Sequence, residues 1–161
     1  MIEMTDKQII EYFKKSYTSV DGLWFMKAEE RFDFDTALQI DAKVWEVMPK
    51  IQARMLKTLA DSGNQLKDLL ECLTTKLALE EFSFRVDDNT DSNGFSVIIT
   101  DCPWHNLMVE SKRENLSVKI GSLVCKNEYE VWAKEFGKDI TFQFAGQICA
   151  GEEKCIFQFS R

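Results

Sequence analysis

The amino-acid sequence predicts an α+β fold in which N-terminal helices pack on a four-stranded antiparallel sheet. Over residues 5–79, apolar side chains recur every three or four positions, which is the period of an amphipathic helix. Over residues 82–86, 140–145 and 155–160 apolar residues alternate with other side chains, which is the period of a half-buried strand, and residues 95–100 add a fourth strand. Because helices and strands are segregated along the chain, we expect the strands to pair antiparallel.

The first predicted helix begins at a capping box. Thr5 and Gln8 have the spacing at which each side chain can bond the backbone at the other position. Apolar residues then follow at helical spacing over residues 9–24. We expect the helix to be interrupted near Gly22 and to resume beyond it, because glycine in a helix interior costs about 1 kcal/mol relative to alanine.

A second predicted helix starts after Asp33 or Asp35 and carries one broad apolar stripe from Leu38 to Leu59. Pro49 lies inside this stripe and lacks the backbone N–H that a helix interior needs. We therefore expect either a kink at Pro49 or two consecutive helices.

A third helix is predicted from residue 65 to about residue 79. The strands that follow, residues 82–86 and 95–100, are expected to form a hairpin. Its turn is assigned to residues 87–94, which are rich in aspartate, asparagine and glycine.

The remaining segments surround the cysteines. Pro103 favours the first position of a helix, which places Cys102 at the N-cap. Residues 115–121 are ambiguous, whereas residues 123–136 predict a helix that ends at Gly137. The last two strands flank a turn at residues 150–153.

Length and composition predict a single domain over residues 1–161, with a helical half (1–80) and an α+β half (81–161) that carries the cysteine site. The 161 residues are 45% apolar, which is enough for one core. The net charge of -7, with basic residues interleaved among acids, disfavours a nucleic-acid partner. We expect a small-molecule ligand or substrate, and a homodimer is a further possibility.

The same features predict a cytoplasmic protein that does not bind membranes. No apolar run approaches the roughly 18 residues that span a bilayer, and the N-terminus is not a signal sequence. Five cysteines, an odd number without an export signal, favour free thiols or metal thiolates in a reducing compartment.

The segment Cys102-Pro103-Trp104-His105 is the centre of the predicted functional site. At a helix N-cap, backbone N–H groups and the helix dipole stabilise a thiolate, so we expect the pKa of Cys102 to lie below the usual value of about 8.5. His105, the single histidine of the chain, lies one turn further on the same face. The alternative is that both side chains are structural, because cysteine is among the most buried residue types.

Two chemistries fit these residues. Cys102, His105, Cys125 and Cys155 together could hold Zn²⁺ in a tetrahedral Cys₃His set, with Cys149 as a substitute ligand. The spacing lacks a Cys-x-x-Cys pair and is therefore not diagnostic.

In the second chemistry, Cys102 is a nucleophile and His105 accepts its proton. Glu128 or Asp101 would then orient the histidine, and Glu128 could also relay protons or replace a zinc ligand. These residues give the predicted catalytic set: Cys102, His105 and Glu128.

A ligand pocket is predicted from aromatic and charged residues, namely Trp24, Asp41, Trp45, Arg54 and Trp104. Trp24 and Trp45 are spaced for helix packing but suit a cavity between helices equally well. Asp41 lies beside the apolar stripe, where an unpaired carboxylate is costly, and Arg54 is its candidate partner. This pair is either a structural ion pair or a polar anchor for a ligand.

Three ordered blocks of the second half resemble the L-2-amino-thiazoline-4-carboxylic acid hydrolase family. They are Thr-Asp-Cys-Pro-Trp at residues 100–104, Val-Cys-Lys-Asn-Glu-Tyr at 124–129, and the segment 147–157 with its Gly-x-x-x-Cys-x-Phe pattern. Residues 21–25 and 51–54 resemble an uncharacterised prokaryotic subgroup often placed beside that family.

The resemblance implies a hydrolase that opens a cyclic amidine-like ring at a carbon–nitrogen bond. Cys102, Cys125 and Cys155 match the family cysteines, Glu128 stands where the family usually has aspartate, and Cys149 is additional. The alternative is a non-catalytic ligand-binding, sensor or accessory domain in which the cysteines form a structural or metal cluster.

The ending of the third block is also similar to the 4-vinyl reductase domain, a small-molecule-binding fold that in some members binds zinc. Phe144 and Gln147 stand where that zinc site would have glutamate and cysteine. A zinc site here would therefore have to recruit Cys102, His105 or Cys149.

Overall fold

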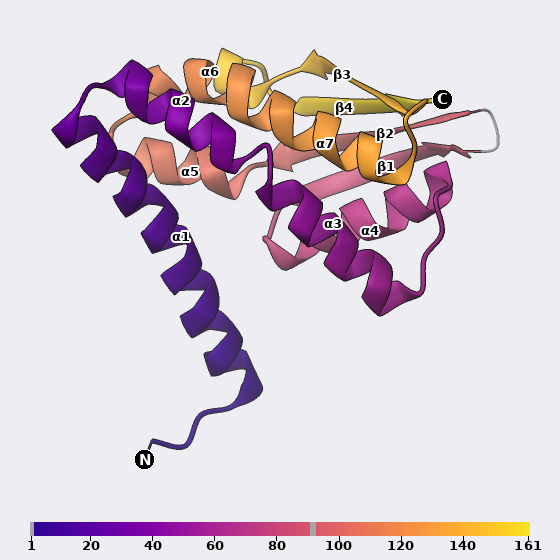
Figure 1. The fold of residues 1–161 in the computed structure, drawn as a ribbon, viewed down its shortest axis with the longest axis horizontal. Coiled ribbons are helices and arrows are strands. Elements are labelled where there is room, and N and C mark those ends of the chain that lie inside the picture. The colour runs from indigo at the N-terminus through magenta and orange to yellow at the C-terminus, as the bar shows by residue number, and fades with distance from the viewer. Residues whose placement is uncertain (1, 91–92) are drawn as a thin grey trace. The chain divides into compact units, whose positions relative to one another are not determined.

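The computed structural model describes residues 2–90 and 93–161 and has an α+β architecture (Figure 1). The chain forms two compact units, one that extends to Lys43 and one that comprises Val44–Arg161. We describe each unit by itself.

The N-terminal unit consists of α1 (Asp6–Arg31) and most of α2 (Phe34–Val44). The predicted capping box is confirmed, because Thr5 accepts a bond from the Gln8 backbone and the Gln8 side chain accepts one from Thr5. The predicted interruption at Gly22 is wrong, since α1 runs unbroken through it. A penalty of about 1 kcal/mol at one position is small beside the propagation of a 26-residue helix.

Pro49 separates two consecutive helices, as predicted. It occupies the first turn of α3 (Met48–Ala60), where its missing N–H costs no helical hydrogen bond. The packing face of α3 differs from the predicted stripe, because Ile51, Met55 and Leu59 are exposed whereas Ala53 is fully buried. The small side chain of Ala53 allows α3 to approach its neighbours closely.

Helix α4 (Leu66–Leu79) confirms the third predicted helix and begins at a capping box formed by Gln65 and Asp68. It contributes a continuous apolar stripe to the core, made of Leu66, Leu69, Leu73 and Leu77.

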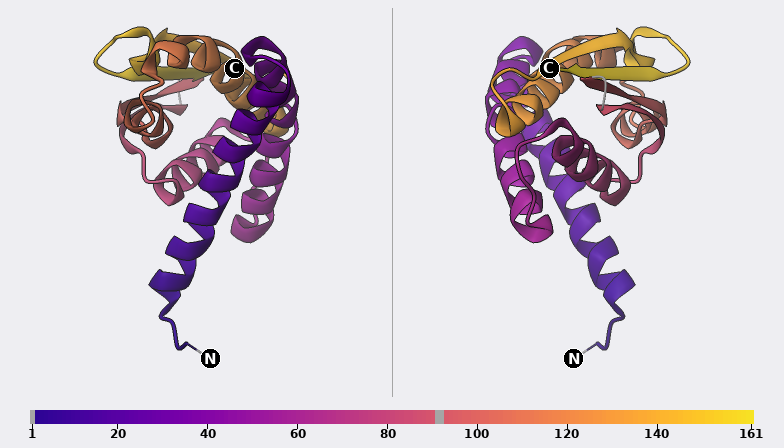
Figure 2. Two further views of the ribbon diagram at one scale, coloured as in Figure 1. Left: turned by 90° about the vertical axis from the view of Figure 1, so that its left-hand side faces the viewer. Right: turned by 90° about the vertical axis from the view of Figure 1, so that its right-hand side faces the viewer.

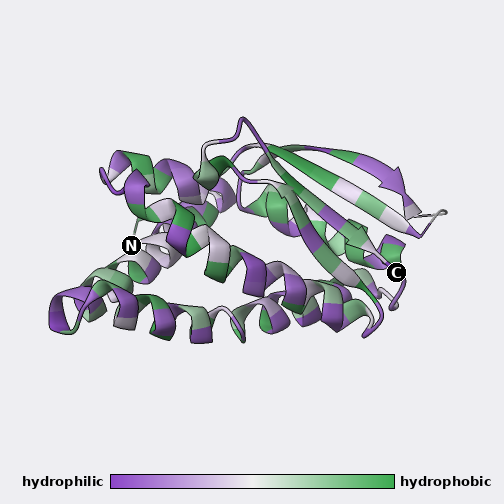
Figure 3. Ribbon diagram, turned by 90° about the horizontal axis from the view of Figure 1, so that it is seen from above, coloured by the Kyte–Doolittle hydropathy of each residue, from purple (hydrophilic) through white to green (hydrophobic). Residues whose placement is uncertain are grey.

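The sheet contains β1 (Ser83–Asn89), β2 (Gly94–Asp101), β3 (Thr141–Gly146) and β4 (Cys155–Ser160) in the order β1-β2-β4-β3. All neighbours are antiparallel, so the predicted four-stranded sheet and the hairpin pairing are confirmed. The turn predicted at 87–94 includes residues 91–92, which lie outside the described residues. The strands contain both hydrophobic and hydrophilic residues (Figure 3).

Helices cover one face of this sheet (Figure 2). After β2 the chain forms α5 (Pro103–Glu110), α6 (Glu114–Ile120), a π-helical turn (Gly121–Cys125) and α7 (Lys126–Phe136). The side chains of α4 and α7 meet those of the strands in one core, whose largest fully buried members include Trp132, Tyr129, Phe136, Phe159, Leu69 and Leu73.

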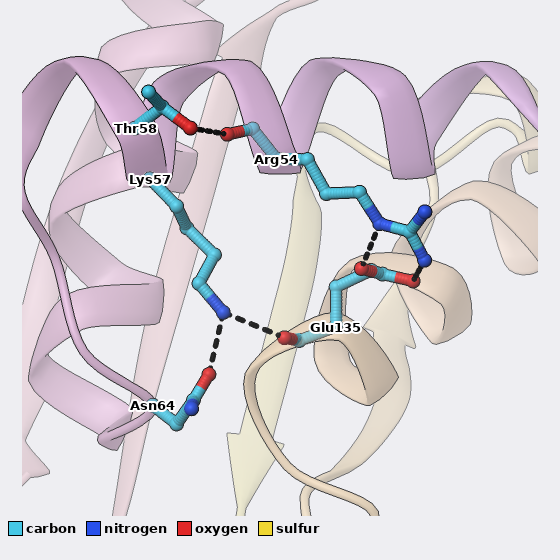
Figure 4. Close-up of polar contacts among 5 residues, drawn as sticks. All are labelled: Arg54, Lys57, Thr58, Asn64 and Glu135. Atoms are coloured by element: carbon cyan, nitrogen blue, oxygen red, sulfur yellow. Dashed lines mark hydrogen bonds and ion pairs between the residues drawn. The ribbon is translucent and has the colours of Figure 1, made fainter.

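Polar contacts connect the outer helix α3 to α7 (Figure 4). Arg54 donates two hydrogen bonds to the Glu135 carboxylate, from Nε at 2.8 Å and from Nη2 at 3.0 Å. Lys57 donates to the backbone oxygen of Glu135 at 3.0 Å and to the Asn64 side chain. Arg54 is thus a surface residue that joins two helices.

Across residues 2–90 and 93–161, the structure contains no helix with both the length and the apolar character that crossing a membrane requires.

Candidate functional site

The C-terminal unit contains a partly open cavity of about 80 Å³ beside the cysteines. By the same measure a water molecule needs about 15 Å³, so the cavity has room for a compact organic group. Its walls come from β2, α5, α6, the π-helical turn, α7, β3, β4 and the turn between those strands. The lining is mainly aromatic and aliphatic, with Phe82, Ile99, Trp104, Met108, Ile120, Tyr129, Phe144, Ile148 and Phe157.

The structure brings every residue predicted for catalysis or zinc to this one cavity. These lining residues are Cys102, His105, Cys125, Glu128, Cys149 and Cys155, and they are joined by Trp104 from the predicted ligand pocket. Cys72, the remaining cysteine, is buried in α4 and is not part of the lining.

Cys102 occupies the N-cap of α5 and is followed by Pro103 in the first turn, as predicted. The expectation of a low thiol pKa is wrong. Burial raises the pKa of Cys102 to about 11, and the backbone amides of His105 and Trp104 offset this only in part. Desolvation of the thiolate therefore outweighs the favourable helix terminus, and the Cys102 thiol is neutral at pH 7.

The other thiols of the cavity behave in the same way. Burial raises the pKa of Cys125 well above its usual value, and the carboxylate of Glu128 raises it further. Burial also raises the pKa of Cys149 and of Cys155. The cavity thus presents four protonated, weakly polar thiols rather than activated thiolates.

A π-helical turn between α6 and α7 shapes one wall. Such a turn inserts an extra residue into the helical repeat and often occurs at functional sites. Its first and last residues, Gly121 and Cys125, both line the cavity. A Cβ atom at Gly121 would lie 2.4 Å from Cys149 Sγ, so only glycine fits beside this thiol.

A tight turn beside the π-helical turn carries Cys149, and Cys155 follows it at the start of β4. Residues Ile148–Ala150 form one 3-10 turn, and Gly151 ends it in the left-handed region at φ 92°. The backbone N–H of Ile148 lies 3.2 Å from Cys155 Sγ and donates to it. This bond holds the Cys155 thiol against the turn.

A buried ion cluster lies behind Glu128 and ties α4 to α7. The ammonium of Lys76, whose side chain is 3% exposed, contacts the Glu128 carboxylate and lies 3.0 Å from Glu80 Oε2. It also lies 5.4 Å from the ring centre of Tyr129 and 5.6 Å from that of Phe82. Burial alone would lower the pKa of Lys76, but attraction to Glu128 and then to Glu80 raises it instead, so the lysine stays charged.

Lys76 was not predicted as a site residue, although the sequence contains a signal for it. It lies three residues after Leu73 and seven after Leu69, on the buried stripe of α4. A lysine on such a stripe requires a buried partner, and Glu128 is that partner.

His105 and the tryptophans complete the description of the lining. His105 Nδ1 is buried and has no hydrogen-bond partner among the described residues. The ring of Trp104 meets that of Trp45 edge to face, with 6.0 Å between the ring centres. Trp45 is 4% exposed and supports Trp104 without itself lining the cavity.

The other residues of the predicted ligand pocket lie elsewhere. Arg54 pairs with Glu135 on the surface of α3 and is not part of the lining. Trp24 and Asp41 belong to the N-terminal unit, where Trp24 is 74% exposed on α1.

No group of three or more histidine, cysteine, aspartate or glutamate side chains is arranged to hold a metal ion in the parts of the chain that the structure describes. The predicted Cys₃His residues line one cavity together with apolar neighbours.

Comparison with protein families gives a match over nearly the whole chain. The model of a family of unknown function, DUF6125, matches residues 3–159. No curated protein matches the sequence. The resemblances to the hydrolase family and to the 4-vinyl reductase domain stay predictions.

The contact between Gly121 and Cys149 predicts a specific stability coupling. Gly121→Ala should lower the free energy of unfolding by about 1–3 kcal/mol, because the new methyl group overpacks the thiol. The added substitution Cys149→Ala should recover most of this loss, since it removes the sulfur. Urea unfolding of the two single variants and the double variant measures the coupling.

Gly22→Ala is the matched control, because a Cβ at Gly22 meets no atom within 4 Å. It should leave stability unchanged or slightly raised. If Gly121→Ala behaves like Gly22→Ala, Cys149 does not constrain this turn.

The raised thiol pKa predicts slow, strongly pH-dependent alkylation of Cys102. The rate with iodoacetamide should still rise about tenfold per pH unit at pH 9–10, because the thiolate fraction is far from saturation below a pKa of about 11. Peptide mass spectrometry measures the rate at each cysteine. Burial favours the neutral form of the Cys102 thiol. The contribution of this thiol to the free energy of unfolding is therefore fully present below the ordinary thiol pKa and is lost as the pH rises through about 11.

In urea the same thiol should titrate near its usual value of about 8.5. A native rate that levels off by pH 8 would show that the helix terminus, and not burial, controls Cys102.

Proposed function

The chain belongs to DUF6125, a family of unknown function, and we propose that it binds a small, mainly apolar molecule in the thiol-lined cavity. The observation that carries this proposal is the cavity itself. Its lining consists largely of aromatic and aliphatic side chains, with a few polar groups that include Glu128 and His105. An apolar pocket with a few convergent polar groups is the usual form of a ligand site.

The neutrality of the thiols favours binding over chemistry. At a pKa of about 11, only about one Cys102 thiol in ten thousand is ionised at pH 7. Neutral thiols are soft, polarisable groups that pack well against an apolar ligand. The core supports the site from behind, because Tyr129 and Phe157 line the cavity while their rings contact each other, with 4.1 Å between ring centres.

The binding proposal predicts that the cavity accepts a small neutral probe and can be blocked. Benzyl alcohol should shift the amide NMR signals of lining residues such as Cys102 and Tyr129. Ile120→Trp should weaken this binding at least tenfold, because the larger side chain fills the space that the ligand needs.

Val118→Trp is the matched control on the same helix, because Val118 is 48% exposed and does not line the cavity. It should bind benzyl alcohol as the unmodified protein does. Equal binding by the protein and both variants would place the probe outside the cavity.

A hydrolase that acts on a carbon–nitrogen bond is the second candidate. It is favoured by the shared location of Cys102, His105 and Glu128 in one cavity and by the backbone amides of Trp104 and His105, which act to lower the pKa of Cys102. In this proposal the Cys102 sulfur bonds to the ring carbon, and His105 or Glu128 carries the thiol proton to the ring nitrogen as the carbon–nitrogen bond breaks. Water then hydrolyses the carbon–sulfur bond and restores the Cys102 thiol.

The hydrolase proposal predicts that Cys102→Ser abolishes ring opening of a cyclic amidine-like substrate while the fold persists. Product formation followed by chromatography, together with the circular dichroism spectrum, tests this outcome. Cys72→Ser is the control, since Cys72 is remote from the lining. Unchanged turnover in Cys102→Ser would remove Cys102 from the mechanism, and metal analysis of the same samples tests for zinc.

A further inference from the structure

We propose that the ligand of this cavity is a compact organic cation that carries N–H groups, such as a protonated primary amine or an amidinium. This inference rests on the proposed binding function and specifies the ligand's chemical class. It follows from the charge of the buried cluster, from the aromatic walls and from an unsatisfied ring nitrogen.

The ion cluster beside the cavity is rich in carboxylates. Glu80 and Glu128 both contact the ammonium of Lys76, so two carboxylates meet one ammonium there. Glu128 lines the cavity, and among the described lining residues none is a lysine or an arginine. A ligand cation would therefore gain attraction at low dielectric, whereas an anion would be repelled.

The aromatic side chains of the lining suit the same charge. Five rings line the cavity, those of Phe82, Trp104, Tyr129, Phe144 and Phe157. Two of them already stabilise a cation, because the Lys76 ammonium lies over Tyr129 and Phe82. Aromatic faces attract ammonium groups by about 0.5–2 kcal/mol each, and most strongly where water is excluded.

His105 adds a hydrogen-bond acceptor for an N–H group. Its Nδ1 atom is buried without a hydrogen-bond partner among the described residues, which is costly unless a ligand supplies one. In a neutral imidazole one ring nitrogen accepts a hydrogen bond. An amine or amidinium N–H can satisfy this nitrogen, whereas a hydrocarbon cannot.

Three probes of nearly equal shape separate charge from size. Benzylammonium, benzyl alcohol and benzoate carry a positive, zero and negative charge on the same ring. Titrations of the full chain at neutral pH and low salt, followed by NMR, should give a dissociation constant for benzylammonium at least tenfold below those of the other two probes. This comparison uses the unmodified protein and is independent of how any variant folds.

A pair of isosteric variants then locates the charge. Glu128→Gln should weaken benzylammonium binding about tenfold more than it weakens benzyl alcohol binding. The control is Glu130→Gln on the same helix, where Glu130 is partly exposed and lies 3.9 Å from Lys126 and 3.8 Å from Lys134. It should change neither affinity.

The outcomes distinguish this inference from the function on which it rests. Equal affinity for all three probes, or tighter binding of benzoate, overturns the cation preference while the cavity remains a binding site. Binding of none of the three at millimolar concentration overturns both proposals.

Discussion

The ion pair between Lys76 and Glu128 is the constraint on which the C-terminal unit depends. It joins α4 to α7, two helices that cover the sheet, and removal of Lys76 alone would take this ammonium away from the buried carboxylate of Glu128. Glu80, at the end of α4, adds a second carboxylate to the same ammonium. Burying these charges carries a desolvation penalty. Apolar residues of similar volume often stabilise a protein as much as a buried ion pair does, or more.

The same cluster sets the electrostatics of the thiols. Burial raises the pKa of Cys125, and the negative charge of Glu128 acts in the same direction. Of the described residues that line the cavity, none is a lysine or an arginine. The π-helical turn and the close approach of Cys149 to Gly121 then fix where the thiols lie. Ionic pairing, burial and backbone geometry thus combine to produce a neutral, sulfur-rich pocket.

Periodicity and capping signals predict the elements well, because they depend on local chemistry. The Thr5 capping box, the separation of two helices at Pro49 and the pairing of β1 with β2 all follow from neighbouring residues. The burial of α3 does not, since Ile51 and Met55 have helical spacing yet face outward. Which face of a helix packs depends on partners remote in sequence, and here the partners favour the small Ala53.

The sequence predicts which residues belong to the candidate site, but not the pKa shifts of these residues or the local backbone geometry. Ordered cysteine blocks indicate that Cys102, Cys125 and Cys155 belong together, and all three line one cavity. The residues next to Cys102 in sequence do not determine whether its pKa is raised or lowered, because the pKa depends on desolvation by residues from other elements. The position of Gly121 in a π-helical turn also has no signal in a single sequence, because glycine in a helical segment predicts a break as readily as a close contact.

The proposed cation binding and the proposed thiol chemistry would be linked if both use this cavity. A positive charge beside the sulfurs would stabilise their thiolates, so a bound organic cation lowers the pKa of Cys102 and Cys125. By reciprocity, thiol ionisation strengthens cation binding by the same free energy. Without a ligand, reaching the Cys102 thiolate at pH 7 costs about 5 kcal/mol, at 1.36 kcal/mol for each unit between a pKa of about 11 and the pH. A cationic substrate would supply part of this energy itself, so catalysis by Cys102 and recognition of an organic cation are compatible uses of one site.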